Sequence, residues 1–162
     1  MIITKIKEKY KMIDRQDSHI IRLLTEDGRM SIHELSEKAG LSHTPVSRRV
    51  KKLEASGIIT GYEARVDERK LGFTFSAFVS VRLDKQIDET LVAFERQIKL
   101  MPEVVDCWLM TGNHDYMLRV VTRDIEEFET FLLRDLTRTQ GVASMESSIP
   151  LRRVKAGAAR TY

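Results

Sequence analysis

Residues 41–58 say more about the fold of this chain than any other stretch, because they carry the pattern of one capped, amphipathic and basic helix. Ser42 stands where an N-cap hydroxyl accepts a hydrogen bond from a first-turn amide. Pro45 falls within that turn, where its missing N–H costs nothing. Gly57 supplies the left-handed residue that ends many helices. The stretch therefore predicts a helix with a defined start and a defined end.

The two sides of this predicted helix differ in chemistry. Apolar residues recur at helical spacing on the side that we expect to pack: Val46, Val50 and Leu53. Polar and basic residues occupy the other side: His43, Thr44, Ser47, Arg48, Lys51 and Lys52. No carboxylate neutralises them before Glu54. Such a face belongs either to a DNA recognition helix or to an ordinary solvated surface, and the helix alone does not separate the two.

The preceding segment favours DNA binding. Apolar spacing from Ile13 predicts a helix that Asp14 caps and that the turn 27–29 ends. Ser31 and Glu34 form a capping box that opens a second helix, and Gly40 permits a tight bend before the third. This order is that of a helix-turn-helix, in which the last helix enters the major groove of double-stranded DNA. The alternative is a helix-turn-helix that no longer binds DNA.

The position of each polar residue suggests its role in a DNA complex. We expect five side chains to contact base edges: His43, Thr44, Ser47, Arg48 and Lys51. Four others lie toward the packed side or at helix starts, so we expect them to contact phosphates: Ser31, Ser42, Arg49 and Lys52. A dimer would place two such helices in successive major grooves and would require a roughly palindromic site.

Charge and cysteine content narrow the class of protein. Residues 1–57 hold 12 Lys and Arg against 8 Asp and Glu, whereas residues 58–162 hold 15 against 16. The excess of positive charge therefore lies in the first third, as expected for a module that binds a polyanion. The chain has one cysteine, and it lacks a signal-peptide pattern and any apolar stretch of membrane-spanning length. We expect a reduced, cytoplasmic protein with no membrane partner.

Changes in pattern divide the chain into five segments. Alternating lysines predict a flexible basic arm over residues 1–12, with DNA backbone contact as a less favoured reading. The helix-turn-helix domain spans 13–60, and a linker strand spans 61–72. The second domain covers 73–155, and 156–162 is a tail.

The second domain alternates between strand and helix patterns. Period-two alternation over 73–83 predicts a strand, helical spacing over 87–98 predicts a helix, and two strands at 104–110 and 116–121 flank the polar turn 111–115. A helix capped by Asp124 follows, with four residues facing inward: Ile125, Phe128, Leu132 and Leu136. The last strand runs over 142–154.

This order is the β-α-β-β-α-β arrangement of α+β ferredoxin-like domains, with an antiparallel sheet and both helices on one face. Within it we interpret Cys107 and Trp108 as packing residues, because no nucleophile arrangement surrounds the thiol. The other sheet face needs cover, and Phe78 lies among its polar positions. We therefore expect the protein to associate with itself through that face.

From Ile13 to Lys155 the chain resembles the Lrp/AsnC family of leucine-responsive, feast/famine transcription regulators. Matching positions occur in order along both halves: Ile13, Asp14, Asp17, Ile20, Asp27 to Arg29, Glu34, Leu35, Leu41, Ser42, Val46, Arg49, Val50, Leu53, Glu54, Gly57, Ile58, Leu71, Gly72, Met101 to Val104, Thr111, Gly112, Asp115, Tyr116, Gly141 and Val142. The resemblance implies a winged helix-turn-helix, a sensor domain that dimerises through its sheet and often assembles into octamers, and an amino-acid effector without any cofactor.

In such proteins the effector lies between dimers, against one turn and residues near the last strand. On this sequence those positions are Thr111, Gly112, Asn113, His114, Asp115, Tyr116, Ser147 and Ser148. Gly112 allows backbone amides to approach a carboxylate, and Asp115 can bind an ammonium group. Spacing alone would favour an ordinary hairpin whose Asp bonds its own backbone. His114 and Asp115 lack further ligands at metal spacing, so we expect no metal.

Two other functions compete with DNA-binding regulation. Some Lrp-like chains are enzymes, such as sirohaem decarboxylases, but the basic helix is intact here and the sensor half lacks a cluster of His and Arg for carboxylate-rich substrates. We therefore expect no enzymatic activity. The other alternative is a modulator that acts mainly by hetero-oligomerising with related chains.

Overall fold

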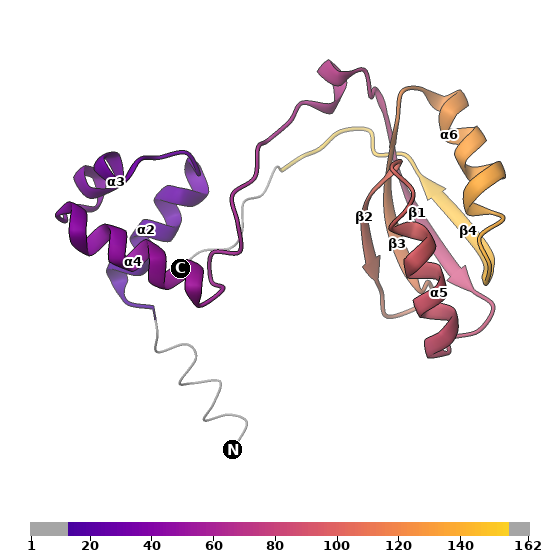
Figure 1. Cartoon of the computed structure of the whole chain (residues 1–162). Coiled ribbons are helices and arrows are strands. Elements are labelled where there is room, and N and C mark those ends of the chain that lie inside the picture. Colours follow the sequence, from indigo (N-terminus) through magenta and orange to yellow (C-terminus); the bar gives the residue numbers. More distant parts are fainter. Residues whose placement is uncertain (1–12, 156–162) are drawn as a thin grey trace. The chain divides into compact units, whose positions relative to one another are not determined.

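The structure is a computed structural model that describes residues 13–155 (Figure 1). The chain divides into two compact units, one that extends to Arg65 and one that runs from Val66 to Val154. The predicted basic arm 1–12 and the predicted tail 156–162 lie outside the described residues.

Three helices make up the described part of the first unit: α2 (Arg15–Glu26), α3 (Ile32–Ala39) and α4 (His43–Ala55). Capping boxes open α2 and α3, with Asp14 and Asp17 at the first and Ser31 and Glu34 at the second. The predicted Ser31 capping box is therefore confirmed. Gly40 ends α3 in the left-handed region with φ of 65°, which a residue with a side chain rarely adopts. This geometry makes the short turn between α3 and α4 possible.

The core of the first unit forms where the three helices meet. Its buried apolar side chains come from all three: Ile20, Leu23, Met30, Leu35, Ala39, Val46, Val50 and Leu53. The predicted inward side of α4 is confirmed, and in α2 the buried apolar residues are Ile20 and Leu23. Because one side of α4 fills the core, its opposite side faces solvent.

The segment after α4 differs from the prediction. Gly57 has φ of 70° and ends α4 as expected. No strand forms between residues 58 and 72, however, so the predicted linker strand over 61–72 is wrong. The side chain of Asp67 accepts hydrogen bonds from the amides of Arg69 and Lys70, and these bonds fold Glu68–Leu71 into a 3-10 turn, η1. Local bonding by Asp67 therefore replaces the extended backbone.

The second unit is a four-stranded antiparallel sheet covered by two helices on one face (Figure 1). Its strands are β1 (Phe75–Leu83), β2 (Val104–Leu109), β3 (Tyr116–Thr122) and β4 (Val142–Ser148), in the order β2-β3-β1-β4. Its helices are α5 (Asp88–Ile98) and α6 (Ile125–Phe131), and α6 continues as a π-helical turn, η2 (Leu132–Leu136). The predicted α+β fold is confirmed.

The sheet presents one buried and one open face, as its register requires. Ala77, Val79 and Val81 of β1 pack against α5 and α6, together with Leu118 and Val120 of β3. The open face carries the alternate residues, because side chains that are paired across antiparallel strands share a face. It includes Phe78, Arg119, Met117 and Trp108, which occupy these positions in the paired register: Phe78 opposite Arg119, and Trp108 opposite Met117.

Several predicted inward residues are exposed. Trp108 retains 45% of its accessible surface, and Cys107 is exposed as well, so their assignment to the core of the chain is wrong. They lie on β2, an edge strand with a single neighbour, which leaves one flank of each uncovered. Ile125 is also exposed, because it occupies the first turn of α6, and Phe131 is buried instead.

Arg119 ties the linker turn to the open face of the sheet. Its guanidinium donates to both carboxylate oxygens of Glu68, at 2.6 and 3.1 Å, and reaches Asp106 at 3.5 Å. The hydrogen bond from Arg119 lowers the pKa of Glu68 below its ordinary value of 4.5. The η1 turn is thus held on the second unit by an ion pair between elements.

None of the helices within residues 13–155 has the length and apolar character needed to cross a membrane.

Candidate DNA interface and effector turn

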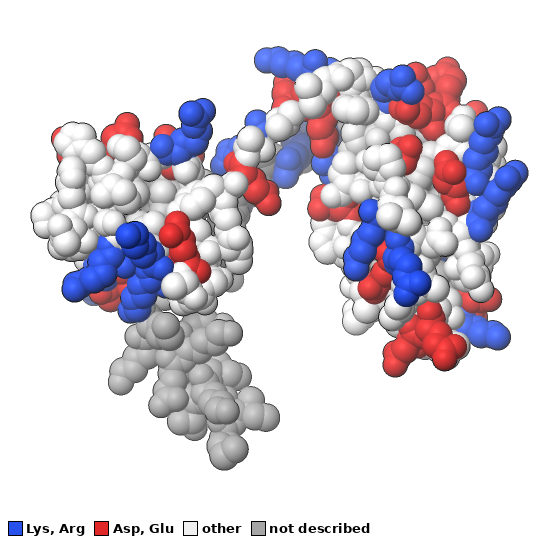
Figure 2. Space-filling view, in the orientation of Figure 1, with Lys and Arg blue, Asp and Glu red and all other residues white. Residues whose placement is uncertain are grey.

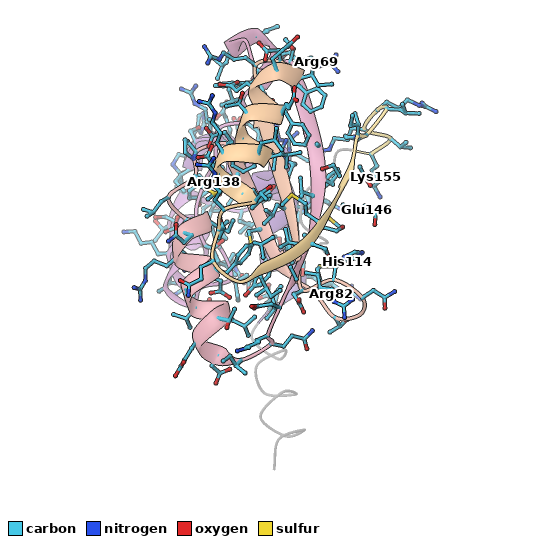
Figure 3. All side chains as sticks on the ribbon, turned by 90° about the vertical axis from the view of Figure 1, so that its right-hand side faces the viewer. Arg69, Arg82, His114, Arg138, Glu146 and Lys155 are labelled. Carbon is cyan, nitrogen blue, oxygen red and sulfur yellow. The ribbon has the colours of Figure 1, made fainter. Side chains whose placement is uncertain are left out.

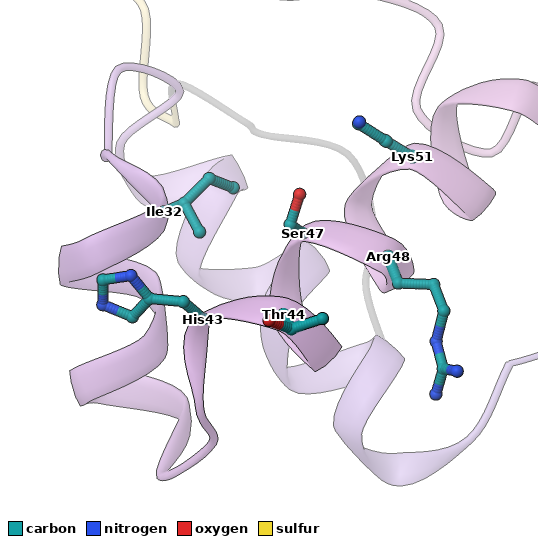
Figure 4. A pocket seen from close by; sticks show the side chains of 6 residues that line it. All are labelled: Ile32, His43, Thr44, Ser47, Arg48 and Lys51. Carbon is teal, nitrogen blue, oxygen red and sulfur yellow. The ribbon is translucent and has the colours of Figure 1, made fainter.

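One shallow cavity on the first unit gathers the predicted base-contacting residues (Figure 4). Its volume is about 590 Å³, and besides Ile32 of α3 it is lined by all five of them: His43, Thr44, Ser47, Arg48 and Lys51. Four of the five are exposed, and Ser47 is partly buried. They share this surface because positions 43, 44, 47, 48 and 51 of a helix lie on one side at spacings of three and four residues.

The cations of α4 remain available for a ligand. Arg48, Lys51 and Lys52 are exposed and take part in no ion pair within residues 13–155. Figure 2 shows Lys and Arg side chains gathered over α4 on one face of this unit. A helix face with uncompensated positive charge attracts the phosphate backbone of a nucleic acid.

Arg49 does not belong to this face. One of its guanidinium nitrogens lies 2.6 Å from a carboxylate oxygen of Asp14 and 2.6 Å from one of Asp17. The hydrogen bond to Asp17 is the main reason that the pKa of Arg49 is raised. The pKa of Asp14 is lowered, first by the hydrogen bond from the amide of Asp17 and then by the one from Arg49. One helical step of 100° beyond Arg48 turns Arg49 toward α2. Its predicted contact with phosphate is therefore replaced by a structural ion pair.

The two serines differ in availability. The hydroxyl of Ser31 donates to the carboxylate of Glu34 and accepts from the amide of Glu34, so it is engaged in the capping box. Ser42 occupies the N-cap of α4, but its side chain makes no capping hydrogen bond, contrary to prediction. It is exposed, so its hydroxyl can bind another acceptor or donor.

In the second unit, the predicted effector turn is the hairpin between β2 and β3. Thr111, Gly112 and Asn113 are exposed, and Gly112 has φ of 111°, in the region that favours glycine. The hairpin prediction is confirmed. These three residues present backbone and short side chains to solvent at one end of the sheet.

The carboxylate of Asp115 forms hydrogen bonds inside the second unit. It is only 6% exposed, and its carboxylate accepts hydrogen bonds from the amide of Leu83 at 2.7 Å and from the side chain of Gln86 at 2.5 Å. Its own amide donates to the carbonyl oxygen of Val81 at 2.9 Å. The expected ammonium-binding role is therefore not what this geometry offers. Asp115 instead fastens the turn to the end of β1.

Tyr116 points into the core. It is 1% exposed, its ring lies 4.6 Å from that of Phe94, and its hydroxyl donates to Glu95 at 2.9 Å. Burial raises the pKa of this phenol. The predicted contact with an effector is wrong for this side chain, since Tyr116 faces α5.

His114 is the part of the turn that meets β4. Its Nε2 lies 3.8 Å from the carboxylate of Glu146, and its Nδ1 is buried without a hydrogen-bond partner among the described residues (Figure 3). Glu146 lies beside the predicted pair Ser147 and Ser148, both of which are exposed on this edge strand. The two serines lie on opposite faces, because they pair with Val79 and Phe78, respectively. The sequence contained no signal for Glu146, since its neighbour is 32 residues away.

The residues of 13–155 include no group of three or more His, Cys, Asp or Glu arranged to hold a metal ion.

Comparison with known proteins assigns both units to families. Residues 13–60 match the winged helix-turn-helix DNA-binding domain family. Residues 76–159 match the Lrp/AsnC ligand binding domain family. Together these matches cover most of the chain.

Two relatives compared by sequence and one solved structure support the same family assignment. The Bkd operon transcriptional regulator of Pseudomonas aeruginosa is 46% identical over 142 residues, which cover 88% of this chain and 93% of that protein. The leucine-responsive regulatory protein of Rhizobium meliloti is 36% identical over 88% of this chain and 92% of its own length. A transcriptional regulator of Neisseria meningitidis, crystallised in complex with L-Met, is similar with a TM-score of 0.86 at 32% identity, over 90% of this chain and 94% of that one.

These relatives are named as transcription regulators rather than as enzymes, and the decarboxylase alternative finds no support among them. The helix-turn-helix, the sheet with its two helices and the sequence matches lead to one conclusion: the chain belongs to the Lrp/AsnC family of DNA-binding transcriptional regulators.

Proposed function

We propose that the chain reads double-stranded DNA through α4 and responds to a small amino acid through its second unit. One observation carries the DNA half: the polar residues His43, Thr44, Ser47, Arg48 and Lys51 line a single surface cavity, and neither Arg48 nor Lys51 is in an ion pair within residues 13–155. These five contact base edges, while Lys52 and Ser42 contact phosphates. Ser31 adds at most a weak phosphate contact, because its hydroxyl is engaged by Glu34.

The effector site is centred on the hairpin 111–114 and the end of β4. Thr111, Gly112 and Asn113 bind the carboxylate of the amino acid, while His114 contacts the remainder. One of the two serines, Ser147 or Ser148, contacts the remainder as well, since these serines lie on opposite faces of β4. Asp115 and Tyr116 shape the turn from within. The names of two relatives, one leucine-responsive and one bound to L-Met, support an apolar amino acid as effector.

Self-association completes this function, because a palindromic DNA site requires two recognition helices. The open face of the sheet is the surface through which two copies pair, and the exposed Trp108 and the partly buried Phe78 give it apolar area. Larger assemblies of dimers, up to octamers, bring effector turns of different dimers together. The cytoplasm, where the DNA is, is the location that this function requires.

A pair of substitutions tests the DNA half. Fluorescence anisotropy on an operator and on random DNA, over a range of salt concentrations, is measured for Arg48→Ala and Lys52→Ala. Arg48→Ala is expected to lose about 1–3 kcal/mol per half-site on the operator alone. Lys52→Ala should weaken binding to both DNAs alike and flatten the salt dependence. Equal losses on both DNAs for Arg48→Ala would remove its base-reading role.

Sedimentation of the full chain, with and without a panel that includes L-Leu and L-Met, tests the effector half. A ligand shifts an assembly only through different affinities for its states, so binding at an interface changes the mass distribution or the DNA affinity. If no amino acid changes either quantity, the effector proposal fails while the DNA-binding proposal stands.

A further inference from the structure

Two histidines from different helices lie next to each other at the edge of the cavity on α4 described above. Nδ1 of His33 on α3 lies 3.1 Å from Nε2 of His43 on α4, and the ring centroids are 5.1 Å apart at an angle of 57°. Both side chains are exposed, and His43 lines the cavity beside Ile32 (Figure 4). The sequence pointed to His43 alone, because His33 lies ten residues earlier on another helix.

A distance of 3.1 Å between two ring nitrogens is a hydrogen bond, so one nitrogen carries a proton and the other accepts it. The other nitrogen of His33, Nε2, lies 3.7 Å from the carboxylate of Glu37 in the next turn of α3. That negative charge favours a proton on Nε2 of His33. Nδ1 of His33 is then the acceptor, and Nε2 of His43 is the donor.

The remaining nitrogen of His43, Nδ1, is therefore an unprotonated acceptor. No hydrogen bond to it occurs within the part of the chain that the structure describes. The charged groups that face this pair are Glu37 and Glu34 on α3, and Arg48 and Lys51 on the cavity side of α4. Arg48 and Lys51 are donors only, so Nδ1 of His43 is the ring acceptor among the cationic donors of this surface.

We propose that His33 is a positioning residue that fixes the ring and tautomer of His43, so that α4 selects a base with an exocyclic amino group at one operator position. In the major groove, adenine offers its N6 amino group and cytosine its N4 amino group, whereas guanine offers only acceptors. This inference rests on the proposed DNA-binding function and specifies its base preference.

The test measures base preference rather than affinity, because a ratio within one protein does not depend on the fraction that is folded. Binding to an operator library randomised in one half-site is sequenced at pH 8 for the wild-type chain, His33→Ala, His33→Asn and His19→Gln. The wild type should favour A or C over G at one position, and His33→Ala should reduce that preference about 3- to 10-fold, the range expected for one hydrogen bond.

His33→Asn tests the chemistry of the contact. Its side-chain oxygen can accept in place of Nδ1 of His33, so it should restore the preference that His33→Ala loses. His19→Gln is the matched control: Nε2 of His19 bonds to the carbonyl oxygen of Lys38, away from the cavity, and Gln keeps a donor there. It should leave the preference unchanged.

Rescue by His33→Asn is the readout that a merely structural role would not move, because only a side chain with an acceptor restores the contact. The inference is overturned if His33→Ala keeps the wild-type preference, or if His33→Asn loses the preference as His33→Ala does. If the wild-type chain binds no DNA at all, the proposed function itself fails, and the two failures are thus distinguishable.

Discussion

The sequence predicts binding sites on the cavity face of α4 and in the turn 111–116 in equal detail. In the structure, the side chains of the first are exposed, whereas key side chains of the second are bonded within the unit. On α4, the five predicted base-contacting side chains lie together on the surface, and among the described residues Arg48 and Lys51 have no acidic partner. In the turn, the two residues with the most specific chemistry are engaged internally. Asp115 holds the amide of Leu83, and Tyr116 lies in the core.

This difference shows what a helix and a turn allow a sequence to reveal. On a helix, the spacing of residues fixes which side chains share a face, so the exposed set follows from the pattern. In a turn, the partner of each side chain depends on which strand end comes near. A buried carboxylate must find donors, and the amide of Leu83, 32 residues from Asp115, is one.

Arg48 and Arg49 are neighbours in sequence but differ most in their surroundings: Arg48 lines the surface cavity, whereas Arg49 forms ion pairs with Asp14 and Asp17. Arg49→Ala leaves the buried carboxylate of Asp17 without its cation, and we expect the free energy of unfolding to fall by about 3 kcal/mol. Urea denaturation of the full chain measures the change. Arg48→Ala, the matched control, should stay within about 0.5 kcal/mol of wild type. A stable Arg49→Ala protein with weakened DNA binding would return Arg49 to the DNA interface.

Asp115→Ala should lower the free energy of unfolding by about 2 kcal/mol in the absence of any amino acid, because the amide of Leu83 loses its acceptor. Asp115→Asn keeps one acceptor oxygen and should lose about half as much. Chemical denaturation compares the two variants with wild type. Wild-type stability of Asp115→Ala combined with lost amino-acid binding would make Asp115 a ligand contact after all.

Trp108 lies outside both the cavity face of α4 and the turn 111–116. Its residue type predicts a packed side chain, but it is exposed on the open face of the sheet. If two copies pair through the open face as proposed, Trp108→Lys should weaken self-association at least 10-fold, or about 1.4 kcal/mol, by placing a charge among the apolar residues of that face. Analytical ultracentrifugation measures the dissociation constant. Leu100→Lys, on an exposed residue outside the sheet, is the control and should associate like wild type. Unchanged association of Trp108→Lys would move the interface elsewhere.

The smallest expected effect is the contribution of Glu68 to the stability of the folded chain at low pH. Its pKa is lowered in the folded protein by the hydrogen bond from Arg119, so its contribution to stability is present above pH 4.5. As the pH falls below 4.5, the unfolded chain takes up a proton at this position before the folded chain does, and that contribution is lost. Glu68→Gln should therefore lose less stability than wild type between pH 6 and pH 3.5. Thermal unfolding across that range checks this, and parallel curves would contradict it.

Much of the fold was accessible from local patterns. Caps at Asp14, Ser31 and Asp124, the glycine at position 40 and the alternation over 75–83 act within a few residues, so the order of elements followed from the sequence. Predictions that needed knowledge of neighbours were less successful. Cys107 and Trp108 are packing residues by sequence pattern, but their strand β2 lies at the edge of the sheet and leaves Trp108 exposed.

By itself, the sequence determined the helix-turn-helix, the basic face of α4 and the family to which the chain belongs. The tertiary structure decided which of the polar residues remain available. Arg49 donates a hydrogen bond to Asp17, 32 residues away, and Asp115 accepts one from the amide of Leu83. The ring nitrogens of His33 and His43 lie within hydrogen-bond distance of each other. The physical reason is that periodicity is a property of one segment, whereas a buried charge or an exposed ring takes its partner from whichever segment the packing brings near.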